Sequence, residues 1–281
     1  MRETAFTKAQ RIVCAAGLAL LALLFVHWFD RSRTIGALPQ AAALLCTLLF
    51  AAVCLRFVPS WFSFWFDERP AEKSEPGSIP LPLLFALGLL WALFNLAAVW
   101  VVLRYVNPNL SWEDYRSFWT SADAYHYLCI ARDWYLSEGI LDRVVQLVFL
   151  PGYPLAVRLL YLFVGDYILS GILVSSLSFA GALCVFYRLL LLDHPEATAR
   201  LALVFLCLIP GAFFFFAPMS EGLFLLLCLS CVYSARKRRW LLAALFGALA
   251  AFTRSLGLML FVPLFFEIVE ALLHGEIMKQ V

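Results

Sequence analysis

Charged side chains are scarce in this sequence. Only 14% of its 281 residues are Asp, Glu, Lys or Arg, and the formal net charge is +2. Soluble globular domains carry about 25% charged residues. The near-neutral balance gives no electrostatic reason to expect a nucleic-acid partner or an acidic one.

Metal-ligand spacings and a disulfide framework are also missing. The four histidines and eight cysteines show none of the short repeated separations that metal sites use, so the sequence predicts no metal ion. All the cysteines except Cys129 lie inside apolar runs. We therefore interpret them as small buried apolar side chains rather than as disulfide partners.

Apolar residues are what the sequence has in excess. They make up 64% of the chain, and the mean hydropathy is +0.88. Soluble chains contain about 45–50% apolar residues, and a single water-soluble core of this size cannot hide the surplus. The predicted fold class is therefore an all-α polytopic membrane protein, with a lipid bilayer as its surroundings and no room for a soluble catalytic domain.

Eight apolar segments are candidate membrane spans, since a crossing needs roughly 20 apolar residues. They are residues 12–29, 38–57, 81–103, 168–192, 201–216, 222–235, 240–253 and 256–268. The last three are short enough to be thin spans or re-entrant segments buried among their neighbours. A polar stretch with prolines at 67–80 reads as a linker, so the predicted domains are an N-terminal hairpin with its linker, 1–80, and a membrane core, 81–281.

Basic residues predict which ends of these spans face the cytoplasm. The run Arg236–Arg239 and the basic residues before the first span fall on the same side, which should be cytoplasmic. Residues 104–151 are then one long extracytoplasmic loop, with short links at 218–221 and 253–255 on the same face. The unusual polar residues gather on that face: Asp123, His126, Tyr127, Glu221 and Arg254.

Residues 123–135 show the spacing of an amphipathic helix. Tyr127, Ile130, Ala131 and Trp134 recur at i, i+3, i+4 and i+7. Such a helix is expected to lie in the headgroup region, holding the Asp123 carboxylate where a lipid-linked substrate presents its polar head. The alternative is that Asp123 only caps the helix, a role that the nearby serine could also fill.

Glu221 and Arg254 have similar pairs of interpretations. Glu221 opens an apolar run, where a carboxylate caps a helix N-terminus, and capping is the simpler reading. Arg254 lies between two apolar runs, where a charge marks an ion pair or a pathway, or else reaches to the headgroups. Its planar fork is well suited to a lipid phosphate. Tyr153 belongs to a rigid aromatic turn at 149–154, whose plain interpretation is an interfacial belt.

Four segments, taken in order, resemble the PIG-V family of integral membrane mannosyltransferases, the GPI mannosyltransferase 2 type, and its bacterial relatives. They are Asp123-Ala-Tyr-His-Tyr-Leu-Cys-Ile-Ala, Phe149-Leu-Pro-Gly-Tyr-Pro, Phe215-Phe-Ala-Pro-Met-Ser-Glu and Thr253-Arg-Ser-Leu-Gly. Each segment alone is weakly specific. The order and the positions between spans make the set more specific, and the resemblance covers roughly residues 81–267.

The resemblance implies a GT-C-type glycosyltransferase architecture. Such an enzyme transfers a mannosyl or other hexosyl residue, with inversion, from a polyprenyl- or dolichyl-phosphate sugar donor to a glycolipid acceptor. It implies Asp123 as the general base and Arg254 as the phosphate ligand. Glu221 would orient Arg254 or bind sugar hydroxyls, and His126, Tyr127 and Tyr153 would line the substrate site. No metal or cofactor is required, because arginine supplies the charge for the leaving phosphate.

The chain also departs from the family pattern. Ala122 and Met219 replace a tryptophan and a tyrosine, which affects the expected shape of the acceptor pocket. The relatives continue through further spans after the Thr-Arg-Ser segment, so the core is expected to be incomplete at its C-terminus. A transporter and a non-catalytic or truncated membrane subunit are the alternative functions. The expected location is a bacterial plasma membrane or an ER membrane, with the active side extracytoplasmic.

Overall fold

The structure is a computed structural model that describes residues 8–31, 40–45, 47–49, 51–52, 55, 77–136 and 144–273. Every regular element in these ranges is helical and none is a strand, which confirms the all-α prediction. The chain divides into two compact units, Met1–Glu72 with Leu208–Pro210, and Lys73–Cys207 with Gly211–Val281. The predicted linker lies outside the described residues except for 77–80.

The first unit contains the helix α1, Lys8–Arg31. Its 24 residues would extend about 36 Å at 1.5 Å per residue, and they include the whole predicted span 12–29. The described parts of the predicted span 38–57 are also helical. There the hydroxyl of Thr47 donates a hydrogen bond of 2.7 Å to the carbonyl of Ala43, one turn earlier.

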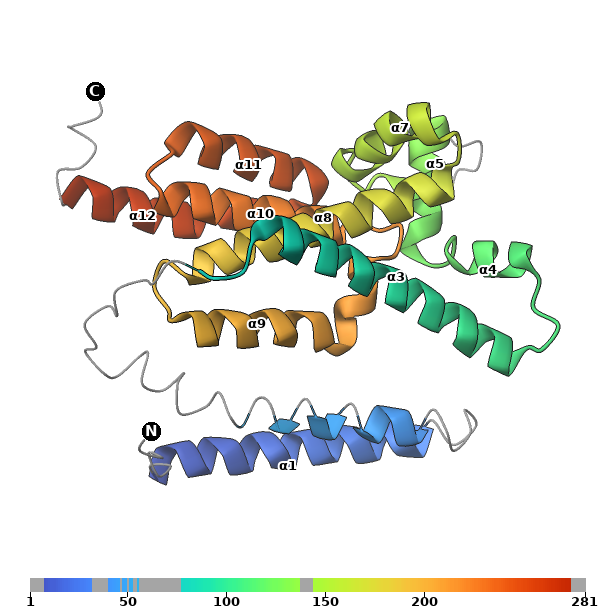
Figure 1. Cartoon of the computed structure of the whole chain (residues 1–281), viewed down its shortest axis with the longest axis horizontal. Helices are drawn as coiled ribbons and strands as arrows, with labels where there is room; N and C mark the ends of the chain where they lie inside the picture. Colours follow the sequence, from blue (N-terminus) through green and yellow to red (C-terminus); the bar gives the residue numbers. More distant parts are fainter. Residues whose placement is uncertain are drawn as a thin grey trace. The chain divides into compact units, whose positions relative to one another are not determined.

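From residue 77 onward the chain forms a bundle of helices (Figure 1). In order they are α3 (Leu81–Val106), α4 (Trp112–Phe118), α5 (Asp123–Asp133), α7 (Gly152–Val164), α8 (Tyr167–Leu190), α9 (Glu196–Leu208), the 3-10 helix η1 (Pro210–Phe215), α10 (Glu221–Arg236), α11 (Trp240–Thr253), the 3-10 helix η2 (Ser255–Leu260) and α12 (Phe261–Leu273).

Helices α3 and α8 are long and apolar enough to cross a membrane. With 26 and 24 residues they would span about 39 and 36 Å, more than the roughly 30 Å of a bilayer's hydrocarbon core. Helix α8 lies at the centre of the second unit and packs against α3, α7 and α10. Gly88 permits the close contact with α3, because a Cβ there would lie 2.9 Å from the Cα of Ala180.

The later apolar segments form shorter helices than full-length spans would need. Helices α9 to α12 contain 13 to 16 residues each. The predicted span 201–216 is divided between α9 and η1 because Pro210 cannot continue an α-helix. The predicted span 256–268 likewise begins as η2 and continues as α12.

The predicted long loop at 104–151 is partly helical. It contains α5, which the apolar spacing predicted, and also α4, which it did not. A capping box starts α4: the Asp114 amide donates to Oγ of Ser111, and the Asp114 carboxylate accepts from the Ser111 amide. Helix α7 was not predicted either; it ends at Gly165, whose φ of 72° suits a residue without a side chain.

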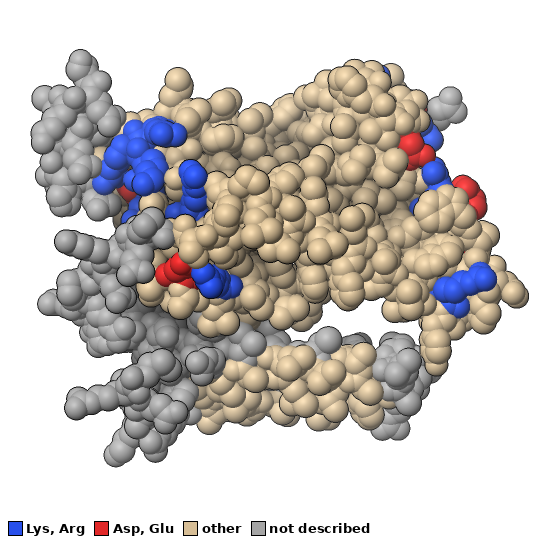
Figure 2. Space-filling view, in the orientation of Figure 1, with Lys and Arg blue, Asp and Glu red and all other residues tan. Residues whose placement is uncertain are grey.

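On the face that Figure 2 shows, charged residues of the second unit gather at opposite ends, with an almost uncharged belt between them. One end is basic and lies where α10 and α12 meet. There Arg236 pairs with Asp193 at 2.5 Å, and Arg238 pairs with Glu267 at 3.0 Å. This arrangement matches what a membrane demands of a helical bundle, since charges are expensive in the hydrocarbon region.

Glu196 joins α9 to the start of the second unit, and it gives a pH-dependent prediction. Hydrogen bonds from Tyr187, Ser78 and Arg200 lower the pKa of its carboxyl from 4.5 to about 2. A lowered folded-state pKa stabilises the fold above the unfolded value, and that stabilisation is lost as pH falls through the folded value. We expect Glu196→Gln to lower the Tm at pH 7, and the gap to wild type to close between about pH 4.5 and pH 2.

Thermal unfolding in detergent across this pH range checks the prediction. Glu113→Gln is the matched control, because the Glu113 side chain is 87% exposed. A gap between Glu196→Gln and wild type that stays constant down to pH 2 would contradict the assignment.

Candidate functional site

Helix α5 begins in an unusual backbone conformation immediately before Asp123. Ala122 has φ 53° and ψ −136°, a region that residues with a Cβ seldom adopt. Such strain costs about 1–3 kcal/mol and is concentrated at functional sites. No side chain caps the helix, since Oγ of Ser121 donates instead to the carbonyl of Phe118 at 2.5 Å. The capping interpretation of Asp123 and Ser121 is therefore wrong: Asp123 is the first helical residue, and its carboxylate is exposed.

The buried face of α5 packs on protein rather than into a headgroup layer. Tyr127, Ile130 and Ala131 are at most 5% exposed, and the helix contacts α7 and α8. Trp134, the last member of the predicted stripe, is 37% exposed and lies at the helix end with a φ of 59°. The spacing thus identified the buried side correctly, but its partner is the helical bundle.

Four polar side chains from three distant segments form one connected cluster. The hydroxyls of Tyr127 and Ser220 are 2.7 Å apart, and both residues are buried. Nη1 of Arg254 donates to Oγ of Ser220 at 3.0 Å and also pairs with the carboxylate of Glu221. The cluster therefore joins α5, the start of α10 and the residue that follows α11. We call these four residues the polar cluster.

Glu221 does not act as a simple cap in this arrangement. It is the first residue of α10, and the preceding Ser220 makes no capping hydrogen bond with its side chain. Both side chains are turned to Arg254 instead. The side chains of Arg254 and Glu221 are 30% and 27% exposed, so the pair is partly shielded from solvent and its attraction is stronger than at an open surface.

A second buried hydrogen-bond network, from α7 and α8, supports the polar cluster. The hydroxyl of Tyr153 on α7 donates to the carbonyl of Gly171 at 2.9 Å and lies 2.9 Å from Oγ of Ser175. Ser175 in turn donates to the carbonyl of Met219 at 3.1 Å. Tyr153 is fully buried, and its ring meets that of Tyr127 edge-on at 5.2 Å. This network fixes the backbone immediately before Ser220.

Glycines allow these segments to approach so closely. A Cβ on Gly152 would lie 2.6 Å from Oγ1 of Thr253, the residue next to Arg254. A Cβ on Gly171 would lie 2.7 Å from Cβ of Pro218, in the connection that leads to Ser220. The start of α7 and the start of α8 therefore hold the two halves of the polar cluster in place.

The hydrogen-bonding capacity of the polar cluster is only partly used. Tyr127 and Ser220 have two hydroxyl protons but only one bond between them, so one proton has no acceptor among the described residues. Oε2 of Glu221 is buried without a partner there, and the hydrogen bonds of Arg254 to Ser220 and Glu221 both use Nη1. Burial raises the pKa of the Tyr127 phenol, which keeps that hydroxyl protonated. The cluster thus offers a cation, a neutral donor and an acceptor to a ligand.

Three of the predicted site residues stay outside this hydrogen-bonded cluster, and one of them, Tyr153, belongs to the second buried network. Asp123 lies one turn before Tyr127 on α5 and influences it only electrostatically. His126 stacks on Phe149, with ring centroids 5.1 Å apart, and its buried Nδ1 makes no hydrogen bond within the described chain. Ser220 and Ser175 are the site residues that the sequence reasoning missed. Only the position of Ser220 within the Pro-x-Ser-Glu segment could have indicated it.

Comparisons with known proteins add no relative to this description. No protein-family model, no curated protein and no solved structure matches the chain. The fold and the site therefore define the protein only by class: within the described residues its regular structure is helical, and two of those helices are long and apolar enough to cross a membrane.

The contact between Gly171 and Pro218 gives a test of how the polar cluster is positioned. Gly171→Ala forces the 218–220 connection away from α8, and overpacking of this kind costs about 1–3 kcal/mol. Gly181→Ala on the same helix is the matched control, because its Cβ would meet nothing nearer than 3.4 Å. We expect thermal unfolding in detergent to show a lower Tm for Gly171→Ala alone. Equal losses in both variants would contradict this packing.

Proposed function

We propose that this protein is a multi-pass membrane glycosyltransferase that moves a mannosyl or other hexosyl residue from a polyprenyl- or dolichyl-phosphate donor to a glycolipid acceptor. The observation that carries the proposal is the partly unsatisfied polar cluster at the start of α10. A cation next to an unpaired acceptor and a neutral donor complements a phosphate joined to a sugar.

Convergence of the four family-like segments supports the same function. Tyr127, Tyr153, Glu221 and Arg254 come from segments spread over more than 120 positions, and contacts link all four. A cluster of this kind could also bind a free anion. Residues of all four segments that resemble the mannosyltransferase family meet in one place, which favours the transferase over a transporter.

The eight-span topology and the GT-C architecture are part of this proposal. Helix α10 runs from Glu221 in the polar cluster to Arg236 in the basic end, so site and basic end lie at opposite ends of one apolar helix. With the basic end cytoplasmic, the polar cluster faces the extracytoplasmic side. A lipid-linked sugar would approach it from that leaflet.

In the proposed reaction the acceptor hydroxyl attacks C1 of the sugar from the face opposite the phosphate. Its proton passes to the Asp123 carboxylate as the new C1–O bond forms. The bond between C1 and the phosphate oxygen breaks, and the lipid phosphate leaves with the electron pair. Arg254 stabilises the charge that develops on the phosphate. Asp123 is exposed at the start of α5, where it can accept a proton from an incoming acceptor.

Glu221 has two roles in this scheme, one for each carboxylate oxygen. Oε1 holds the guanidinium of Arg254 in place, and Oε2 is left to accept a hydrogen bond from a sugar hydroxyl. The hydroxyl proton that the Tyr127–Ser220 hydrogen bond leaves free forms a hydrogen bond to a phosphate or sugar oxygen of the lipid-linked sugar. His126 and Tyr153 shape the wall of the site, Tyr153 through its support of the 218–220 connection.

Sugar transfer by membranes that contain wild type or Asp123→Asn tests the proposal. Radiolabelled polyprenyl-phosphate mannose is the donor, and endogenous lipids are the acceptors. A positioned general base contributes about 10²–10⁴-fold, so we expect the near-isosteric Asn variant to lose transfer by that order. Asp133→Asn, at the other end of α5 and paired with Arg132, is the control and should retain full activity.

The possible outcomes separate the enzyme from its assigned base. Unchanged transfer by Asp123→Asn would keep the transferase and remove Asp123 as the base. If folded wild type transfers no label from this donor, the proposed reaction is wrong, and solute uptake by proteoliposomes would then favour a transporter.

A further inference from the structure

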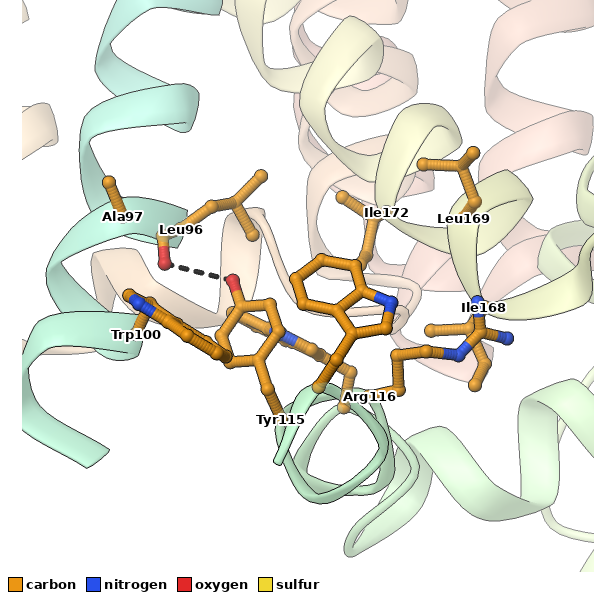
Figure 3. Close-up of a pocket in the computed structure, with 10 residues that line it drawn as sticks. Leu96, Ala97, Trp100, Tyr115, Arg116, Ile168, Leu169 and Ile172 are labelled. Atoms are coloured by element: carbon orange, nitrogen blue, oxygen red, sulfur yellow. Dashed lines mark hydrogen bonds between the residues drawn. The ribbon is translucent and has the colours of Figure 1, made fainter. Parts of the chain in front are cut away.

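An aromatic pocket lies apart from the polar cluster, between α3, α4 and the start of α8. Its cavity volume is about 490 Å³, within the range of small-molecule sites. Its walls include Leu96, Trp100, Tyr115, Trp119, Ile168 and Ile172, so almost every group that faces the cavity is apolar (Figure 3). We call it the aromatic pocket.

The walls of the aromatic pocket are rigidly built. The Tyr115 hydroxyl donates to the carbonyl of Leu96 at 2.9 Å, which fastens α4 to α3 (Figure 3). The rings of Trp100 and Tyr115 meet edge-on at 5.1 Å, and Trp119 stacks on Phe213 at 5.5 Å. A cavity with such walls is a built space between helices rather than a loose gap.

Two polar groups at the aromatic pocket determine how a ligand would be oriented in it. Arg116 lines its rim, where Nη2 pairs with Asp166 at 2.6 Å and Nε lies 4.0 Å from the Glu113 carboxylate, which leaves Nη1 for a ligand. Burial disfavours ionisation of Asp166, but hydrogen bonds from the Leu169 amide and Arg116 outweigh it and lower the Asp166 pKa. In the wall, Trp119 is 2% exposed, and its indole N–H lies near the Tyr115 hydroxyl without the geometry of a full hydrogen bond. A fitting ligand is thus a hydrocarbon with one buried acceptor and an anionic group at the rim.

The helices around the aromatic pocket indicate where such a ligand comes from. Both α3 and α8 are long and apolar enough to cross a membrane. Three tryptophans and a tyrosine surround the cavity, and these are the residues that collect at the boundary between headgroups and hydrocarbon. Trp112 is 62% exposed at the edge of the same wall. The source is therefore the surrounding bilayer.

We propose that the aromatic pocket binds one acyl chain of an anionic glycerophospholipid, with the ester carbonyl near Trp119 and the phosphate near Arg116. A polyprenyl chain lacks a carbonyl that could accept the Trp119 hydrogen bond, and it is much longer than the pocket. Bound there, the acyl chain holds α4 against α3 and α8. It thereby supports the segment that leads into α5 and Asp123.

This inference does not rest on sugar transfer, and its test measures only bound lipid. Purified full chain is mixed with dioleoyl phosphatidylglycerol in detergent and examined by native mass spectrometry. Ala97 lies on the α3 wall of the pocket, so Ala97→Trp fills the cavity. Val102→Trp is the control on the same helix, because Val102 is 59% exposed and does not line the pocket.

We expect wild type and Val102→Trp to retain one more phosphatidylglycerol than Ala97→Trp. Equal retention by all three would overturn the proposal. Retention of undecaprenyl phosphate in preference to phosphatidylglycerol, with the same sensitivity to Ala97→Trp, would also overturn it and assign the pocket to a polyprenyl lipid.

A second measurement uses only wild type and therefore does not depend on how the variants fold. Phosphatidylglycerol with a photoreactive group on one acyl chain is incorporated into vesicles with the protein. We expect crosslinks within peptides that carry Trp100, Trp119 or Ile172. Crosslinks confined to the outward residues Leu90 and Leu93 would contradict the proposal, because these are more than 60% exposed and do not line the cavity.

Discussion

The ion pair between Arg254 and Glu221 is the interaction on which the proposed site depends. It joins the residue after α11 to the first residue of α10, in a position that is partly shielded from solvent. Charge burial of this kind is weak evidence for stability, because desolvation offsets much of the attraction. Its value lies in specificity. The pair fixes one geometry for a guanidinium that also holds Ser220, and through it Tyr127.

Close backbone contacts make that geometry possible. Gly152 and Gly171 let the start of α7 and the start of α8 pack closely against the segments that carry Arg254 and Ser220. Tyr153 and Ser175 then satisfy the buried carbonyls of Gly171 and Met219, so the tight packing leaves those two groups paired. The strained backbone at Ala122 places Asp123 at the rim of the same region. Strain, small residues and shared hydroxyls all concentrate where four separate segments meet.

The sequence predicts the fold of this protein better than it predicts the contacts of the polar cluster. Apolar composition predicted an all-helical fold, and the spacing around Tyr127 predicted α5 and its buried side. Helix α7 was not predicted because this mostly apolar segment of 13 residues is too short for a span and begins inside the turn predicted at 149–154. The polar cluster could be anticipated only as residues on one face. That Ser220 links Tyr127 to Arg254 depends on helix packing, which a local pattern does not encode.

Binding of undecaprenyl phosphate without its sugar tests the central claim, that Arg254 held by Glu221 is the site for a lipid phosphate. Affinity is measured on purified chain for wild type, Arg254→Gln and Arg132→Gln, the last being an exposed arginine on α5. Loss of a charge-assisted contact worth roughly 1.5–3 kcal/mol predicts binding about 10- to 100-fold weaker for Arg254→Gln only. Equal affinity in all three proteins would contradict the account.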